Sequence, residues 1–183
     1  MPDENSEKTR GRLELYDVLE TVAAALVICV ITFVFAVRIV DVDGSSMYPT
    51  LYDRDKLIVS NLFFKPEQGD IVVLKKADFM DQPIVKRVIA VGGQTVNIDF
   101  DSGTVYVDGK ALEEPYTASP TNDPEDFQGP QTVPAGCIFV MGDNRNKSTD
   151  SRFSLVGMVD ERLVLGRVYL IIFPFSHFGI PAG

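Results

Sequence analysis

The strongest hydrophobic signal lies near the N-terminus. Residues 22–37 read VAAALVICVITFVFAV, and Thr32 is the one polar residue of this run. At ~1.5 Å per residue, a helix over the run is about 24 Å long, and its continuation to Val40 gives about 28 Å, close to a hydrocarbon core of ~30 Å. The pattern therefore predicts a transmembrane helix over residues 21–40, with Arg38 reaching toward the interface.

Two other interpretations of this run are a buried core helix and a cleavable signal peptide. A soluble helix of this length is expected to have a polar face, which the run lacks. A cleavable peptide is expected to have a shorter apolar core and a small-x-small cleavage site, whereas Arg38 and bulky residues end this run. We therefore expect an uncleaved signal anchor.

Basic residues predict how this anchor is oriented. Lys8, Arg10 and Arg12 precede it, and only Arg38 follows closely. The positive-inside rule then places residues 1–20 in the cytoplasm as a short tail. The prediction is a single-pass protein of the cell membrane whose remaining part, residues 41–183, is an extracytoplasmic domain.

After residue 40 the pattern changes to short alternating or apolar segments separated by Gly, Pro and Asp. It predicts a mainly β fold of bent antiparallel sheets or a partial barrel, preceded by the single N-terminal transmembrane helix. The candidate strands are 56–59, 70–74, 84–91, 95–100, 104–107, 137–141 and 163–173. Turns after residues 100 and 107 predict a pair of hairpins within 95–112.

Three further segments are less regular. A short helix fits residues 159–162. Residues 113–134 are rich in Pro, Asp and Thr and predict a loop, either a flap beside a substrate or a solvated connection. Leu62, Phe63 and Phe64 fit either the membrane interface or the core.

Charge and cysteine content exclude several classes of function. The formal net charge of −9 argues against nucleic-acid binding. Cys29 lies in the apolar run and Cys137 in the β-rich part, so an intramolecular disulfide is not expected. A Cys/His zinc site lacks ligands, and we expect neither a metal nor another cofactor.

The only histidine, His177, lies near the C-terminus. A serine hydrolase would therefore need another base, and a desolvated lysine can serve as one. Strand alternation places Lys86 on a face that is otherwise apolar, shared with Ile84, Val88 and Ala90. Taken alone, such a lysine also fits an edge-strand guard or an ion-pair partner.

Ser46 follows Gly44 at a turn, and such turns expose the backbone N–H groups that an oxyanion hole needs. An ordinary turn is the alternative. The chain has neither a Gly-x-Ser-x-Gly elbow nor a Ser-x-x-Lys motif. Residues 142–152, GDNRNKSTDSR, predict a rigid loop held by ion pairs and Asx turns.

Four segments in this order resemble the motifs of the type I signal peptidases (leader peptidases): 44–51 (GSSMYPTL), 69–73 (GDIVV), 85–89 (VKRVI) and 142–152. The resemblance is to the compact single-span bacterial type. It implies a membrane-bound serine endopeptidase that cleaves N-terminal signal peptides from exported preproteins with a Ser/Lys dyad. Preprotein signal peptides and membrane lipid are the expected partners.

The resemblance also implies roles for individual residues. Ser46 would be the nucleophile, Lys86 the general base, and Ser148 a serine that hydrogen-bonds and orients this lysine. Charged residues would brace the site: Asp143, Arg145, Asp150, Arg152 and Arg87. Small apolar pockets, which would accept the small residues of an Ala-x-Ala cleavage site, would be lined by Val40, Val42, Met47, Leu51 and Val85.

Two positions depart from the family pattern. Gly44 stands where some members have a serine whose hydroxyl helps the oxyanion hole, so backbone N–H groups, including that of Ser46, would carry more of this role. Lys147 places a second lysine beside Ser148, and its polar neighbours favour a solvated, charged side chain.

Three alternatives remain at this level. One is a maturation peptidase dedicated to a single exported substrate, and another is an inactive, membrane-tethered β-rich binding module. The third is a peptidase like the self-cleaving repressors, which also use Ser/Lys chemistry but should carry a DNA-binding region.

Overall fold

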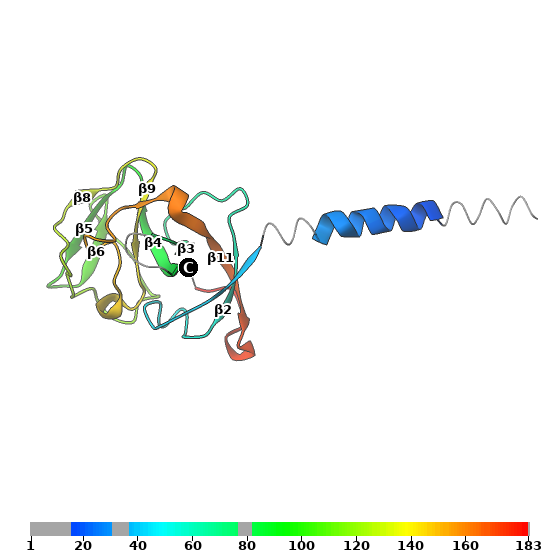
Figure 1. Cartoon of the computed structure of the whole chain (residues 1–183). Coiled ribbons are helices and arrows are strands. Elements are labelled where there is room, and N and C mark those ends of the chain that lie inside the picture. The colour runs from blue at the N-terminus through cyan, green and yellow to red at the C-terminus, as the bar shows by residue number, and fades with distance from the viewer. Residues whose placement is uncertain (1–15, 31–36, 77–81, 183) are drawn as a thin grey trace, which may run out of the picture. The chain divides into compact units, whose positions relative to one another are not determined.

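The computed structural model describes residues 16–30, 37–76 and 82–182. Contacts within the chain divide it into two units, Met1–Val37 and Arg38–Gly183. In the first unit, residues 16–30 form a helix (Figure 1). No helix among the described residues is both long enough and apolar enough to cross a membrane. The basic residues of the predicted tail and residues 31–36 of the predicted span lie outside the described residues.

The second unit begins with a strand where the sequence predicted the end of the membrane helix. Strand β1, Arg38–Asp41, pairs antiparallel with β2, Lys56–Ser60, and Val40 lies opposite Leu57. Val40 packs against the core of this unit, whereas Ile39 is exposed. A continuous apolar run therefore contains both a helix and the start of a strand, because hydrophobicity alone does not distinguish them.

Antiparallel strands form two sheets, which confirms the predicted mainly β fold. The larger sheet has seven strands in the order β1-β2-β11-β3-β4-β9-β10. Its other strands are β3 (Ile71–Leu74), β4 (Ile84–Val91), β9 (Cys137–Met141), β10 (Val159–Asp160) and β11 (Val164–Phe173). Figure 1 shows this sheet curling from β2 and β11 toward β4 and β9.

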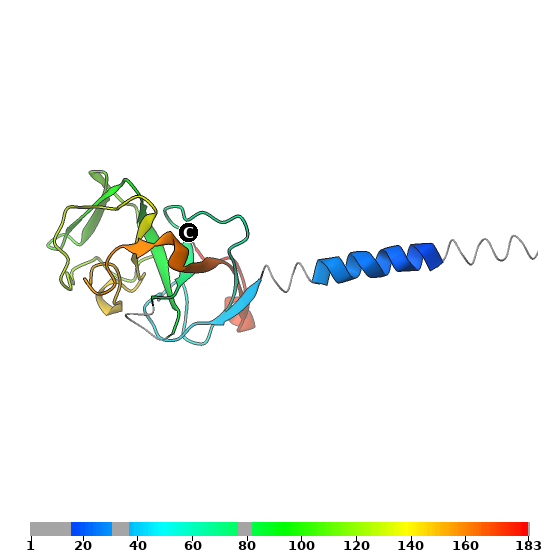
Figure 2. The same cartoon turned by 45° about the horizontal axis from the view of Figure 1, so that its top comes forward.

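The smaller sheet has the order β7-β6-β5-β8. Its strands are β5 (Thr95–Asp99), β6 (Thr104–Val107), β7 (Lys110–Ala111) and β8 (Gln131–Thr132). The predicted hairpins within 95–112 are therefore present, since β6 pairs with both β5 and β7. The smaller sheet lies to one side of the larger one in both views (Figures 1 and 2).

Three short 3₁₀ helices complete the fold: η1 (Arg145–Lys147), η2 (Glu161–Leu163) and η3 (Phe175–His177). The predicted helix at 159–162 is instead β10 followed by η2, since residues 159 and 160 pair with β9. The predicted loop at 113–134 contains β8, which adds an edge to the smaller sheet.

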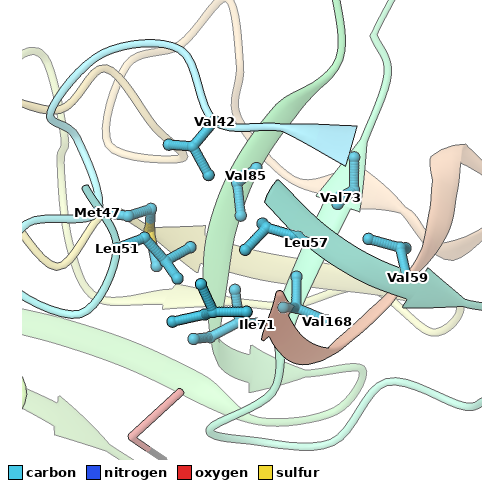
Figure 3. Close-up of a cluster of buried hydrophobic side chains, with 10 residues drawn as sticks. Val42, Met47, Leu51, Leu57, Val59, Ile71, Val73, Val85 and Val168 are labelled. Carbon is cyan, nitrogen blue, oxygen red and sulfur yellow. The ribbon is translucent and has the colours of Figure 1, made fainter. Parts of the chain in front are cut away.

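The segment that carries Ser46 is fixed to the larger sheet by its apolar neighbours. Met47 is 1% exposed and Leu51 is fully buried, and both lie in a cluster with side chains from β2, β3, β4 and β11. Figure 3 shows Met47 and Leu51 directed into this cluster together with Val42 and Val85. Val42 precedes Ser46 in the chain, and Met47 and Leu51 follow it. Since burying an apolar side chain contributes roughly 1.5–3 kcal/mol, the turn at Ser46 is fixed to the sheet on both its N-terminal and its C-terminal side.

Strand β4 follows the predicted alternation only over its first half. Ile84 and Val88 pack in one cluster, as expected for the face that carries Lys86. Ala90 was predicted on that face but packs with Ile89 in another cluster, beneath the smaller sheet. A register shift between Val88 and Ala90 causes this change, since a β-bulge adds a residue to one strand and alters which way later side chains face.

Candidate active site

Ser46 and Lys86 meet in the second unit. The Nζ atom of Lys86 donates a hydrogen bond to Ser46 Oγ at 2.7 Å. Lys86 extends from β4, where it lies opposite Val72 of β3. Its side chain is nearly inaccessible, at 3% exposure, whereas Ser46 is half-buried. A hydroxyl that remains reachable thus contacts an amine that is shielded from water.

Burial changes the acidity of this lysine. Desolvation lowers the pKa of Lys86 to about 8, and the carboxylates of Asp150, Glu125 and Asp143 oppose part of this shift. The direction follows from the cost of holding an ammonium ion away from water. A useful fraction of the amine is therefore neutral near pH 8, which a solvated lysine would not provide.

Asp150 organises the loop between β9 and β10. Its Oδ2 atom accepts hydrogen bonds from Gly142 N–H, Ser148 Oγ and Arg152 Nη2, each at 2.9 Å. Its Oδ1 atom accepts from Arg152 Nε, also at 2.9 Å. The side chains of Asp150 and Arg152 are both fully buried. This agrees with the predicted rigid loop held by ion pairs.

The Ser148 hydroxyl donates to Asp150, whereas the hydrogen bond of Lys86 goes to Ser46. Ser148 is buried beside the same residues. A role for Ser148 in orienting Lys86 therefore stays a prediction.

Arg87, the neighbour of Lys86, forms the second buried ion pair. Its Nε and Nη2 atoms donate to the two carboxylate oxygens of Asp143, each at 2.8 Å. Both side chains have no exposed surface. Thr50 donates to the same carboxylate at 2.5 Å, and the ring of Tyr116 lies 3.8 Å from the Arg87 guanidinium carbon. The segments of both candidate catalytic residues are thus joined to the loop after β9.

The 113–134 segment supplies partners that the sequence did not reveal. Arg145, one of the predicted brace residues, forms a two-pronged ion pair with Glu114, and its Nη1 atom donates to Thr121 Oγ1 at 2.9 Å. Arg145 is 1% exposed. Part of this predicted loop is therefore a brace of the site, and neither a flap nor a solvated connection describes it fully.

Asn144 links the loop directly to the turn at Ser46. Its backbone N–H donates to the Ser46 carbonyl at 3.0 Å, and its side chain donates to the Ser45 carbonyl at 3.0 Å. The sequence places Asn144 inside a motif, but its role depends on contacts with residues nearly a hundred positions away. Its position within the motif is the one feature of the sequence that could have identified Asn144 as a residue of the site.

A cleft of about 230 Å³ opens beside Ser46 and Lys86. Of the predicted pocket residues, Val42, Met47 and Val85 line it. The other two, Val40 and Leu51, lie in the cluster behind these residues. The cleft is therefore partly apolar. Its lining also includes the charged residues Asp41, Asp43 and Lys147, and is completed by Gly44, Ser45, Pro83, Ile84 and Thr149.

Gly44 also lines this cleft, with a φ of +89° that favours glycine. Its N–H donates to Asp53 Oδ1 at 2.9 Å, so this group is already engaged. No acceptor for the N–H of Ser46 occurs in the part of the chain that the structure describes. This N–H therefore remains available to a carbonyl oxygen placed at Ser46.

His177 is engaged elsewhere. Its Nδ1 atom lies 2.9 Å from Asp55 Oδ1, and its ring packs on Tyr52 with centroids 4.4 Å apart. It does not line the cleft at Ser46. Within residues 16–30, 37–76 and 82–182, no group of three or more His, Cys, Asp or Glu side chains is arranged to hold a metal ion.

Comparisons with known proteins identify the family of this chain. The family model of signal peptidase, peptidase S26, matches residues 15–173. A signal peptidase I from Bacillus amyloliquefaciens is 40% identical over 165 residues, which cover 84% of this chain and 82% of that protein. Signal peptidase I S from Bacillus subtilis (strain 168) is 36% identical over 97% of both chains.

A crystal structure of a signal peptidase I from Enterococcus faecalis V583 is 32% identical and covers 57% of this chain and 97% of that chain, with a TM-score of 0.48. The family match extends through both units and includes the turn at Ser46, strand β4 and the loop after β9. The chain therefore belongs to the signal peptidase I family of S26 serine peptidases, which cleave signal peptides from secreted proteins.

Proposed function

We propose that this signal peptidase cleaves with a Ser46–Lys86 dyad. The observation that carries the proposal is the 2.7 Å contact between a reachable hydroxyl and a buried lysine whose pKa is lowered to about 8. A general base must lie within hydrogen-bond reach of the proton that it removes, and its pKa should be near the working pH. Lys86 meets both conditions.

The steps follow from these two groups. Neutral Lys86 removes the proton of Ser46 Oγ, which forms a bond to the scissile carbonyl carbon, and the negative charge moves to the carbonyl oxygen. Lys86 then gives the proton to the leaving nitrogen as the C–N bond breaks, which leaves an acyl-enzyme. Neutral Lys86 next deprotonates a water molecule, whose oxygen attacks the ester carbon. The ester C–O bond then breaks, and Lys86 returns the proton to Ser46 Oγ. The N–H of Ser46 is the proposed donor to the oxyanion.

The cleft supports a preference for small residues before the cleavage site. Val42, Met47 and Val85 give it an apolar lining, and its volume is about 230 Å³. Ligand pockets for larger molecules usually exceed ~300 Å³. We propose that alanine-sized side chains at the first and third positions before the scissile bond enter this cleft.

The N-terminal run supports the membrane part of the proposal. We propose that residues 21–37 anchor the protein, with the N-terminus in the cytoplasm and the β-rich unit on the outer side. Leu62 and Phe63 are 52% and 98% exposed, which favours the interface over the core for these two side chains.

Cleavage of a purified preprotein, followed by sequencing of the new N-terminus, tests the proposed dyad. Ser46→Ala and Lys86→Ala should each abolish cleavage with the fold intact. Lys86→Arg should also be inactive, since a guanidinium does not release its proton near neutral pH. Lys110→Ala is the control, because Lys110 is an exposed lysine of the smaller sheet that does not line the cleft, and it should retain cleavage.

Retained cleavage in either alanine variant of the dyad would contradict the proposal. A panel of unrelated preproteins separates a general signal peptidase from one dedicated to a single substrate, since only the general enzyme should cleave most of the panel.

A further inference from the structure

Two exposed charges of opposite sign line the cleft at Ser46. Asp43 lies between β1 and the turn that carries Ser46, and Lys147 is the last residue of η1 in the loop after β9. Both residues are exposed. Within residues 16–30, 37–76 and 82–182, neither side chain takes part in a hydrogen bond or an ion pair, with each other or with a third group. The cleft therefore presents a carboxylate and an ammonium that a bound substrate can reach.

The segment before Ser46 turns Asp43 away from the apolar part of the cleft. Val42 continues the pairing of β1 with the chain around β2, since its N–H donates to the Asp55 carbonyl at 2.8 Å. The Val42 side chain is buried in the apolar cluster of Figure 3. Successive side chains of an extended chain face opposite sides. Asp43, the next residue, is accordingly exposed.

A similar alternation exposes Lys147. Ser148 is extended, with a φ of −133° and a ψ of 123°, so the side chains of its two neighbours face the side opposite its own. Ser148 is buried, whereas Lys147 and Thr149 are exposed and line the cleft. The backbone N–H of Lys147 donates to the Asn144 carbonyl at 2.9 Å, and the N–H of Asn144 donates to the Ser46 carbonyl at 3.0 Å. These two hydrogen bonds fix the backbone at Lys147 relative to the nucleophile.

An extended substrate brings one of its side chains to these charges. In the proposed complex, the first and third residues before the scissile bond both place their side chains in the apolar part of the cleft. Side chains two positions apart share a face in an extended chain, so the second residue faces away from the buried cluster and toward the exposed part of the cleft. Asp41, which also lines the cleft, is paired with Lys56 at 2.7 Å. The unpaired charges that the second residue meets are therefore Asp43 and Lys147.

We propose that Asp43 and Lys147 are specificity-determining residues that read the charge of the second residue before the scissile bond. Asp43 pairs with a basic side chain at this position and repels an acidic one, and Lys147 does the reverse. Together, the two opposite charges let the enzyme accept either sign. Removal of one charge leaves the other unopposed, so that selectivity by charge emerges. This inference rests on the proposed function, because it takes the orientation of the substrate from the Ser46–Lys86 dyad and the apolar part of the cleft.

Preproteins that differ only in carrying lysine, glutamate or serine at this position test the inference. The readout is kcat/KM for the lysine or the glutamate substrate, each divided by kcat/KM for the serine substrate. Asp43→Asn should lower the lysine ratio and raise the glutamate ratio, each by about twofold to fivefold, the range expected for an exposed ion pair. Lys147→Gln should change both ratios in the opposite direction. A higher salt concentration should reduce these shifts, because it screens exposed charges.

The ratios separate recognition of charge from damage to the fold, since a displaced turn at Ser46 lowers cleavage of all three substrates alike. Asp101→Asn and Lys110→Gln are the matched controls, because both residues are exposed, lie in or beside the smaller sheet and do not line the cleft. Their ratios should equal those of the wild type. Unchanged ratios in Asp43→Asn or in Lys147→Gln would overturn the role of that residue. Shifts of the same sign in both variants would overturn the inference as a whole.

A measurement without catalysis separates this inference from the dyad. In Ser46→Ala protein, the Kd values of the same three preproteins give binding ratios that do not depend on the chemical step. Adding Asp43→Asn or Lys147→Gln should shift these ratios in opposite directions, and unchanged binding ratios in both would overturn the inference. Cleavage that survives Ser46→Ala or Lys86→Ala would instead contradict the dyad, whatever the ratios.

Discussion

Lys86 Nζ and Ser46 Oγ lie 2.7 Å apart although forty positions separate the two residues in the chain. The contact depends on two supports that are unrelated in sequence. Strand β4 carries Lys86 within the larger sheet, and the buried side chain of Met47 fixes the turn that carries Ser46. Predictions about activity and stability follow from the burial of this pair and of the ion pairs around it.

The first prediction concerns pH. The rate of preprotein cleavage should rise with pH through a midpoint near 8, because neutral Lys86 is the active form and the pKa of Lys86 is lowered to about 8. A pH profile of kcat/KM measures this. A rate that stays constant from about pH 5 to pH 9 would contradict a lysine base.

The second prediction is that Lys86→Met stabilises the protein while abolishing cleavage. Below about pH 8 the folded protein must bury an ammonium that the unfolded chain leaves in water, and the pKa difference corresponds to a cost on the order of 3 kcal/mol. Methionine fills similar space without charge. Chemical denaturation at pH 7 should show the gain.

This gain should shrink as the pH rises from about 8 toward 10.5, since the wild-type lysine then becomes neutral in the fold. A gain of constant size over this range would indicate better packing rather than relief of a buried charge.

The third prediction concerns the ion pair of Arg87 and Asp143. Asp143→Ala leaves a fully buried guanidinium without its carboxylate, so the free energy of unfolding should fall by about 3–5 kcal/mol. Arg162→Ala is the control, because the side chain of Arg162 is 88% exposed in its pair with Asp160. Its loss should have a much smaller effect on the free energy of unfolding, since exposed ion pairs contribute little to stability. Similar losses in the two variants would show that the buried pair has no special weight.

The fourth prediction concerns Gly142. A Cβ atom there would overlap Ser148 Oγ and lie 2.5 Å from the Ser46 carbonyl oxygen. Gly142→Ala should therefore displace the turn at Ser46 and lower kcat/KM by about 10² or more, since small misplacements of reacting groups are costly. Gly93→Ala is the control: its Cβ meets open space, and its φ of +92° makes the substitution costly for stability, but kcat/KM of the folded enzyme should stay within about threefold.

Local pattern alone predicted much of the β fold. The ranges 84–91, 104–107 and 137–141 match β4, β6 and β9 residue for residue. Short apolar stretches between Gly, Pro and Asp have few other ways to bury their side chains. The apolar run after residue 21 was different, because strand β1 within it is formed by pairing with β2 and not by its own composition.

The sequence by itself determined the family and the candidate pair, since four motifs in order identify Ser46 and Lys86 without any coordinates. The tertiary structure decided which groups surround that pair. Asn144 and Glu114 belong to the site through contacts across long stretches of chain, and Ser148 donates to Asp150. Such contacts depend on how the sheets and loops pack, and on which charges this packing isolates from water, so no local pattern records them.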